Sequence, residues 1–168
     1  AWSPKGFTAV KIDSSRIFNG HARVIAWSHT AVINDESQAE GYIHVRSERG
    51  RWGLTEMAWI LTPRLKVKEL RVQRCRSNSG HYLESLGFQK LIRGMGLEEM
   101  RKMVSADGST LDEAFVNRIP AENHKVALMA IRSGLKTILT TQLVWERTLA
   151  SLGYVAPTSI LEEEGSKQ

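Results

Sequence analysis

The feature that most constrains the fold is a long apolar segment that follows Ile119-Pro120. Apolar side chains occupy most sides of this segment between Val126 and Ile131, and they recur at helical spacing as far as Ile138. Because proline suits the first turn of a helix, the pattern predicts a helix that begins near Ala121. A helix that is apolar on most sides needs cover all round, so we expect it to be well buried.

Four short segments upstream of this helix have the composition of β-strands and are separated by turn residues. They are rich in Val, Ile and Trp or alternate between two unlike faces, and they run over residues 21–33, 41–46, 52–61 and 65–75. Short strands that follow one another through turns favour an antiparallel meander. The sequence therefore predicts an α+β fold, with an antiparallel sheet of about four or more strands packed against helices.

Shorter helices are predicted on either side of the long one. An apolar stripe predicts a helix over residues 83–95 that closes on Gly94, and a further helical turn is predicted after Gly96. Beyond the long helix, the pattern predicts a separate helix over residues 143–152 that ends at Gly153.

The length of 168 residues predicts a single domain. Residues 20–153 contain all the predicted elements. Residues 1–19 are predicted to be a loosely structured extension, and residues 154–168 a polar tail. No run of about eighteen apolar residues occurs, so the sequence predicts no membrane span.

The positive charge of the chain is local. Between Arg64 and Arg76, six cations minus the one carboxylate of Glu69 give +5, which equals the formal net charge of the whole chain. A local excess of this kind indicates an acidic neighbour more than a general polyanion binder. The six cations are Arg64, Lys66, Lys68, Arg71, Arg74 and Arg76.

Three interpretations of this basic strand are open. A solvated or edge face and a contact with a protein partner are both favoured. A nucleic-acid interface is less favoured, because the strand lacks interleaved aromatic side chains that would stack on bases. Trp2, in a segment too polar to fold alone, is a second candidate for a partner contact.

The sequence contains no pattern typical of a catalytic or metal site. Its five histidines form no His-x-His or His-x-x-x-His pair, and Cys75 is the only cysteine, which excludes an internal disulfide and a cysteine-based zinc site. No Gly-x-Ser-x-Gly elbow or Walker loop occurs. Glu98 and Glu99 are adjacent, so on a helix their side chains point apart. We therefore predict no catalytic residues and no metal ligands.

Three motifs follow one another between the predicted sheet and the long helix. They are Arg76-Ser77-Asn78-Ser79-Gly80, the run from Phe88 to Gly94, and the run from Ile119 to Asn123. Their order resembles the FMN-binding domain of the sodium-pumping NADH:quinone reductase, of related electron-transport complexes and of nitrous-oxide-reductase accessory regulators. That family has an Arg/Glu-Ser/Thr-x-Gly turn, a Gln-Phe-x-Gly-Lys helix end and an Ile-Ser-Gly-Ala-Thr segment whose threonine esterifies the FMN phosphate. The likeness covers roughly residues 41–139.

The resemblance implies that Gly80 and Asn123 lie at flavin-cradle positions, with Asn123 where the family has its threonine. Asparagine has no hydroxyl with which to form a phosphoester. Pro120 removes an N–H that would bind phosphate, and Glu122 brings a negative charge toward it. We therefore expect this domain to resemble a flavin carrier that has lost its covalent flavin.

A second register of the same motif is possible at Asp107-Gly108-Ser109-Thr110, with Thr110 as the acceptor. The plainer interpretation is a turn followed by a short helix over residues 110–118, in which Thr110 is the cap and Glu113 completes a capping box. We rank Asn123 above Thr110 as the motif equivalent, because the long apolar helix follows Asn123 directly.

The resemblance implies a non-catalytic accessory or assembly subunit of a membrane-associated electron-transport complex, with other subunits as partners and no cofactor. It also implies a place in the periplasm or on the extracytoplasmic face of a membrane, although nothing in the chain itself argues against the cytoplasm. The main alternative is an active electron-transfer domain that carries FMN, either covalently on Thr110 or noncovalently. A basic nucleic-acid-binding module is the second alternative.

Overall fold

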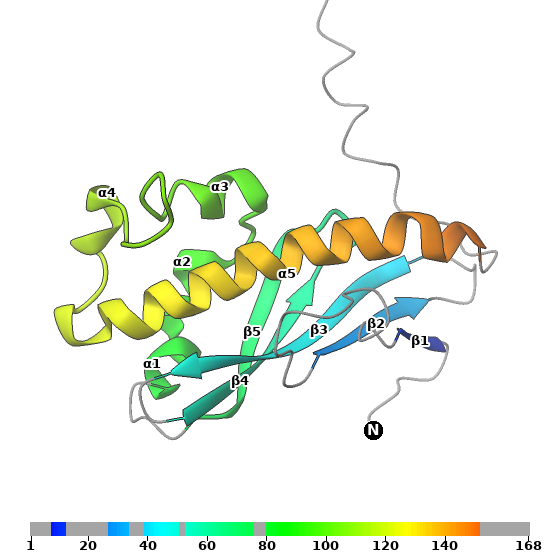
Figure 1. Cartoon of the computed structure of the whole chain (residues 1–168), viewed down its shortest axis with the longest axis horizontal. Coiled ribbons are helices and arrows are strands. Elements are labelled where there is room, and N and C mark those ends of the chain that lie inside the picture. Colours follow the sequence, from blue (N-terminus) through cyan, green and yellow to red (C-terminus); the bar gives the residue numbers. More distant parts are fainter. Residues whose placement is uncertain (1–7, 13–26, 34–38, 51–52, 76–79, 152–168) are drawn as a thin grey trace, which may run out of the picture.

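In a computed structural model, the chain is described over residues 8–12, 27–33, 39–50, 53–75 and 80–151. Five strands form one antiparallel sheet in the order β1-β2-β3-β4-β5. Figure 1 shows α5 lying across one face of this sheet, with α1 to α4 gathered around the N-terminal half of α5. The elements are β1 (Thr8–Ile12), β2 (Trp27–Ile33), β3 (Ala39–Gly50), β4 (Gly53–Leu61), β5 (Val67–Arg74), α1 (Gly80–Glu84), α2 (Leu86–Ile92), α3 (Leu97–Arg101), α4 (Glu113–Val116), the 3₁₀ turn η2 (Ala121–Asn123) and α5 (His124–Ser151).

The predicted α+β fold is confirmed, and each of the four predicted strands has a counterpart in the meander. The fifth strand was not predicted. β1 lies within the segment expected to be loosely structured, and it pairs with β2 from Thr8 opposite Ile33 to Ile12 opposite His29. Its five residues are too few to signal a strand alone, so the pairing with β2 is what defines it. The remainder of the predicted extension, the polar tail and Trp2 lie outside the described residues.

The turn between β4 and β5 holds a buried leucine in a left-handed conformation. The Leu65 N–H donates to the Thr62 carbonyl over 2.9 Å, and the Thr62 N–H donates to the Lys66 carbonyl over 2.8 Å. Leu65 has φ of 57°, which costs an L-residue about 1–2 kcal/mol. Its side chain is nevertheless buried in the core, and burying a leucine is worth about 1.5–3 kcal/mol. The burial therefore offsets the strain of the turn.

The helix predicted over residues 83–95 is divided in two. Ser85 has an extended backbone and caps α2, because its side chain accepts a hydrogen bond from the Phe88 N–H. This local bond stabilises a helix start in the middle of the apolar stripe. The predicted stop at Gly94 is present, and its φ of 78° is a conformation that glycine adopts without strain.

The two helices predicted after Pro120 form one helix of 28 residues, so the prediction of a separate helix over residues 143–152 is wrong. Two adjacent threonines near the middle of α5, Thr140 and Thr141, weaken its intrinsic helix propensity. Both are buried, so packing sustains the helix through this stretch.

Trp59 is fully buried near the middle of the core. Its indole N–H donates to the Ser133 hydroxyl over 3.2 Å. A Cβ on Gly134 would lie 2.8 Å from Trp59 Cη2 and 2.5 Å from Met100 Cε. Glycine at position 134 thus allows the tryptophan ring and α3 to approach the backbone of α5.

Candidate functional site

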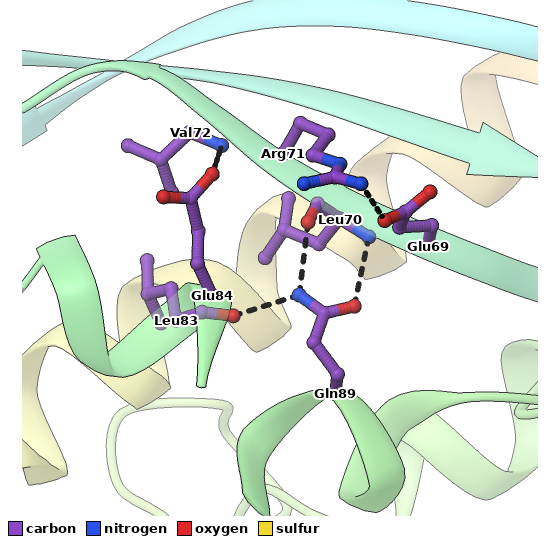
Figure 2. A network of polar contacts seen from close by, with 7 residues as sticks. All are labelled: Glu69, Leu70, Arg71, Val72, Leu83, Glu84 and Gln89. Atoms are coloured by element: carbon purple, nitrogen blue, oxygen red, sulfur yellow. Dashed lines mark hydrogen bonds and ion pairs between the residues drawn. The ribbon is translucent and has the colours of Figure 1, made fainter. Parts of the chain in front are cut away.

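Gln89, within the second motif, clamps α2 to the outer edge of β5. Its amide nitrogen donates to the carbonyls of Leu70 and Leu83, each over 2.8 Å, and its amide oxygen accepts from the Leu70 N–H over 3.3 Å. Figure 2 shows the side chain reaching from α2 to β5 beside the end of α1. Since Gln89 is 9% exposed and bonded to backbone on two elements, we assign this motif residue a structural role.

Neighbouring groups complete the cover of the same strand edge. The Val72 N–H donates to the Glu84 carboxylate over 3.1 Å. The Val67 N–H donates to the Met95 carbonyl over 2.8 Å, and the Val67 carbonyl accepts from the Gly94 N–H over 2.7 Å. Three segments, α1, α2 and the turn at Gly94, therefore hold β5 through its backbone. Figure 2 shows the contacts from Glu84 and Gln89.

Gly80 is the buried first residue of α1. A Cβ at this position would lie 2.8 Å from Cys75 Cβ and 3.1 Å from Cys75 Sγ. Close packing against the end of β5 is thus enough to require glycine here. The rest of its motif, residues 76–79 with Arg76, lies outside the described residues.

Asn123 ends the 3₁₀ turn η2 and stands immediately before α5, which begins at His124. Its backbone N–H is used in the turn, donating to the Pro120 carbonyl over 2.8 Å. The His124 ring bonds back to the Ile119 carbonyl over 2.8 Å and so fixes the entry of the chain into α5. The structure therefore places Asn123 directly before the long helix, which begins at His124 and not near Ala121 as predicted, because residues 121–123 form the 3₁₀ turn.

Thr110 lies elsewhere, in the loop between α3 and α4. Its N–H donates to the Ser105 hydroxyl over 3.1 Å, and its carbonyl accepts from the Ser105 N–H over 3.0 Å. The helix cap is Asp112, whose side chain accepts from the Ala114 N–H, so the predicted cap at Thr110 is wrong. α4 has only four residues and is not the long helix that follows the acceptor threonine in the resembling family.

The Thr110 loop also carries a negative charge. The Ser105 hydroxyl donates to Asp107 Oδ1 over 2.6 Å, and the Ser109 N–H donates to the same oxygen over 3.0 Å. These hydrogen bonds, that of Ser105 first, hold the pKa of Asp107 below its ordinary value. The carboxylate therefore stays ionised at neutral pH and disfavours a phosphate group beside Thr110. Arg101, which donates to the carbonyls of Ser105 and Ala106, brings one positive charge to the same loop.

A surface depression of about 330 Å³ lies beside Pro120, between α1 and α2 on one side and the α4–η2 segment on the other. Two of its lining residues, Lys90 and Arg118, are cationic, and none is a carboxylate. The lining residues are Tyr82, Gly87, Lys90, Leu91, Arg118 and Pro120. Asn123, Gly80 and Thr110 are not among them, so the three predicted cofactor positions do not meet in this depression.

The electrostatics of the depression are set by Tyr82 and its neighbours. Burial, and secondly the charge of Glu122, raise the pKa of the Tyr82 phenol above its ordinary value. The Tyr82 ring also packs on Phe88, with centroids 5.4 Å apart, while the Arg118 guanidinium lies over the Phe115 ring at 5.2 Å. The depression thus combines a neutral phenol with two cations, and the charge of Glu122 acts on the phenol.

The basic strand is accessible to solvent over its described part. Its five described cations are all exposed, and Arg71 forms an ion pair with Glu69 over 2.6 Å. Arg71 and Arg74 lie on the sheet face opposite α5, because their register partners Ala58 and Glu56 alternate with Met57 and Trp59, which face the core. An exposed pair of this kind adds about 0–1 kcal/mol to stability.

Sequence reasoning missed a buried polar region on the face of β3 that α5 covers. His44 and Arg46 are 0% and 3% exposed, and both lie on the side of β3 that faces α5. Arg46 Nε lies 2.9 Å from Glu48, which also approaches Lys136 over 3.5 Å. Burial lowers the pKa of Arg46, and Glu48 acts in the opposite direction. The alternation of residues 42–48 was visible in the sequence, but it does not reveal which face is covered.

Over the residues described here, no helix is long and apolar enough to cross a membrane, and no cluster of His, Cys, Asp or Glu is arranged to hold a metal ion. Comparison with protein-family models, with curated proteins and with solved structures finds no match to this chain.

Proposed function

We propose that this protein is a non-catalytic accessory or assembly subunit of a membrane-associated electron-transport complex, built on an FMN-binding-like scaffold without covalent flavin. The observation that carries the proposal is the position of Asn123 at the start of α5, where the resembling family has its phosphoester threonine. A carboxamide cannot form that ester. In the same turn, Pro120 lacks the N–H that would bind a phosphate, and Glu122 contributes a negative charge.

The other two motif residues support the proposal. Gly80 is required by the approach of Cys75, and Gln89 is fully used in holding β5. Each therefore has a role in packing that persists without a cofactor. A scaffold that keeps these packing contacts but has a different acceptor residue is consistent with a protein that acts by binding other proteins and not through a cofactor.

A second candidate function is an electron-transfer domain that holds FMN noncovalently. The specific observation in its favour is the depression beside Pro120, where Lys90 and Arg118 offer two cations to an anionic ligand. Thr110 as a covalent acceptor is less favoured, since its loop carries Asp107 and precedes only a short helix.

The flavin content of the protein purified from its own host separates these candidates. We expect an intact mass equal to that of the polypeptide, unchanged in Thr110→Ala, and a colourless supernatant after denaturation. A mass gain of one FMN moiety that disappears in Thr110→Ala would establish the covalent alternative. A yellow supernatant with an unchanged mass would establish the noncovalent one.

The accessory role is tested in cells that lack the protein. We expect the electron-transfer activity of their membranes to fall, and wild type and Asn123→Ala to restore it equally, because residue 123 does no chemistry. Full membrane activity without the protein, or failure of Asn123→Ala despite normal protein levels, would contradict the proposal.

A further inference from the structure

The sheet has a second face that the described helices leave uncovered. α5 crosses one side of the sheet, and α1 to α4 gather around its N-terminal half (Figure 1). On the side away from α5, register pairs Ile43 with Ile60 and Val45 with Ala58. Ile43, Val45 and Ile60 remain partly exposed although they are aliphatic. We call Ile43, Val45, Leu54 and Ile60, together with the buried Ala58, the open face.

The open face has a cationic margin formed by β5 and the β3–β4 hairpin. Arg71 lies opposite Ala58, Arg74 lies opposite Glu56, and Arg49 lies opposite Leu54. With Glu56 and Glu69 on the same side, three arginines minus two glutamates leave a net charge of +1. All three arginines are exposed, whereas both glutamates are partly buried, so the positive groups are the ones presented to a partner.

This combination fits a protein surface better than other ligands. Aliphatic side chains at the centre with arginines at the margin match the anatomy of protein interfaces. A nucleic acid fits less well, because the open face offers aliphatic groups where base stacking needs aromatic ones. A second copy of this chain would bring the same positive margin against itself.

We propose that the open face is the docking surface for a partner protein that presents an apolar centre and an acidic rim. The inference rests on the proposed accessory function, for which it names the contact surface. The sequence already indicated the exposed cations of β5 as candidate partner contacts. In the folded protein these cations lie beside apolar residues of β3 and β4, which form one surface only when the two strands pair.

Site-specific photo-crosslinking in cells that make the protein tests this proposal. A benzoylphenylalanine probe replaces Ile60 on the open face, or Arg132 on the exposed side of α5 as the control. We expect one crosslinked protein from position 60 and none from position 132, with a crosslinked peptide that combines apolar and acidic residues. The paired change Arg71→Glu and Arg74→Glu should lower the yield at least about tenfold, because it places like charges together.

The paired change Lys125→Glu and Arg132→Glu is the matched control for charge, and it should leave the yield from position 60 unchanged. Equal loss in both pairs would overturn the proposal. So would equal crosslinking from both probe positions, no crosslink from position 60, or crosslinks to a second copy, to nucleic acid or to residues 152–168. Flavin content is measured in a separate experiment, so the docking proposal and the proposal of a flavin-free scaffold can be contradicted independently.

Discussion

The two halves of α5 rest on the same sheet but use different chemistry. The first half buries Ala127, Ala130 and Ile131 against the core that holds Phe88 and Trp59. From Thr137 onward the helix buries Thr137, Thr140 and Thr141 together with Ile138. It lies across the sheet face (Figure 1) to which the register assigns the buried His44 and Arg46 of β3. Removal of apolar area from water stabilises the first region. The second region buries hydroxyl, imidazole and guanidinium groups, and its polar contacts include the ion pair of Arg46 with Glu48. Such groups gain less net stability from burial than apolar side chains do.

The largest predicted effect is in the apolar region. Phe88→Ala removes a fully buried ring from the core and should lower the free energy of unfolding by about 3–5 kcal/mol, since transfer and cavity costs add. Urea denaturation measures the change. Leu86→Ala is the matched control, because Leu86 lies two residues away and is 78% exposed, so it should change stability by less than about 0.5 kcal/mol. Equal effects of the two variants would contradict the assigned core.

A smaller effect is predicted in the polar region. Arg46→Met leaves Glu48 without its closest cation and should lower the free energy of unfolding by about 2–3 kcal/mol. This is less than for a fully buried pair, because the Glu48 side chain is 16% exposed and keeps Lys136.

The double variant Arg46→Met with Glu48→Leu sharpens the comparison. Removing both charges should return stability to within about 1 kcal/mol of wild type, since neither member of the Arg46–Glu48 pair is then left without the other. The same denaturation experiment measures it as a double-mutant cycle. A double variant as unstable as the sum of the single ones would show that Arg46 is anchored mainly by groups other than Glu48.

The smallest predicted effect is a shift in titration. Glu122→Gln removes the charge that contributes to the raised pKa of Tyr82, so this pKa should fall toward its ordinary value. Because the folded pKa is raised, the stability linked to the protonated phenol is complete below the ordinary pKa. It is lost as pH rises through the folded value. Carbon NMR of the assigned Tyr82 ring measures the shift, with Glu113→Gln as control. An unchanged Tyr82 pKa in Glu122→Gln would show that the charge of Glu122 does not act on the phenol.

The sequence predicts the elements that depend on local patterns better than the contacts that depend on folding. Strands β2 to β5, the stop at Gly94 and a long helix soon after Pro120 were predictable, since local patterns determine them. The break at Ser85 and the continuity of α5 through Thr140 depend on capping and tertiary packing. The depression joins Lys90 and Arg118 from segments far apart in the chain. The targets of Gln89 are backbone groups of Leu70 and Leu83, which no side-chain pattern reveals.

The clamp on β5 has a consequence for how this protein can assemble. An exposed margin of a sheet acts as a template onto which another extended chain can add. At β5 the amides of Val67, Leu70 and Val72 already donate to groups within the molecule. Strand addition at this margin would first have to displace α1 and α2, so an incoming chain finds no ready template there.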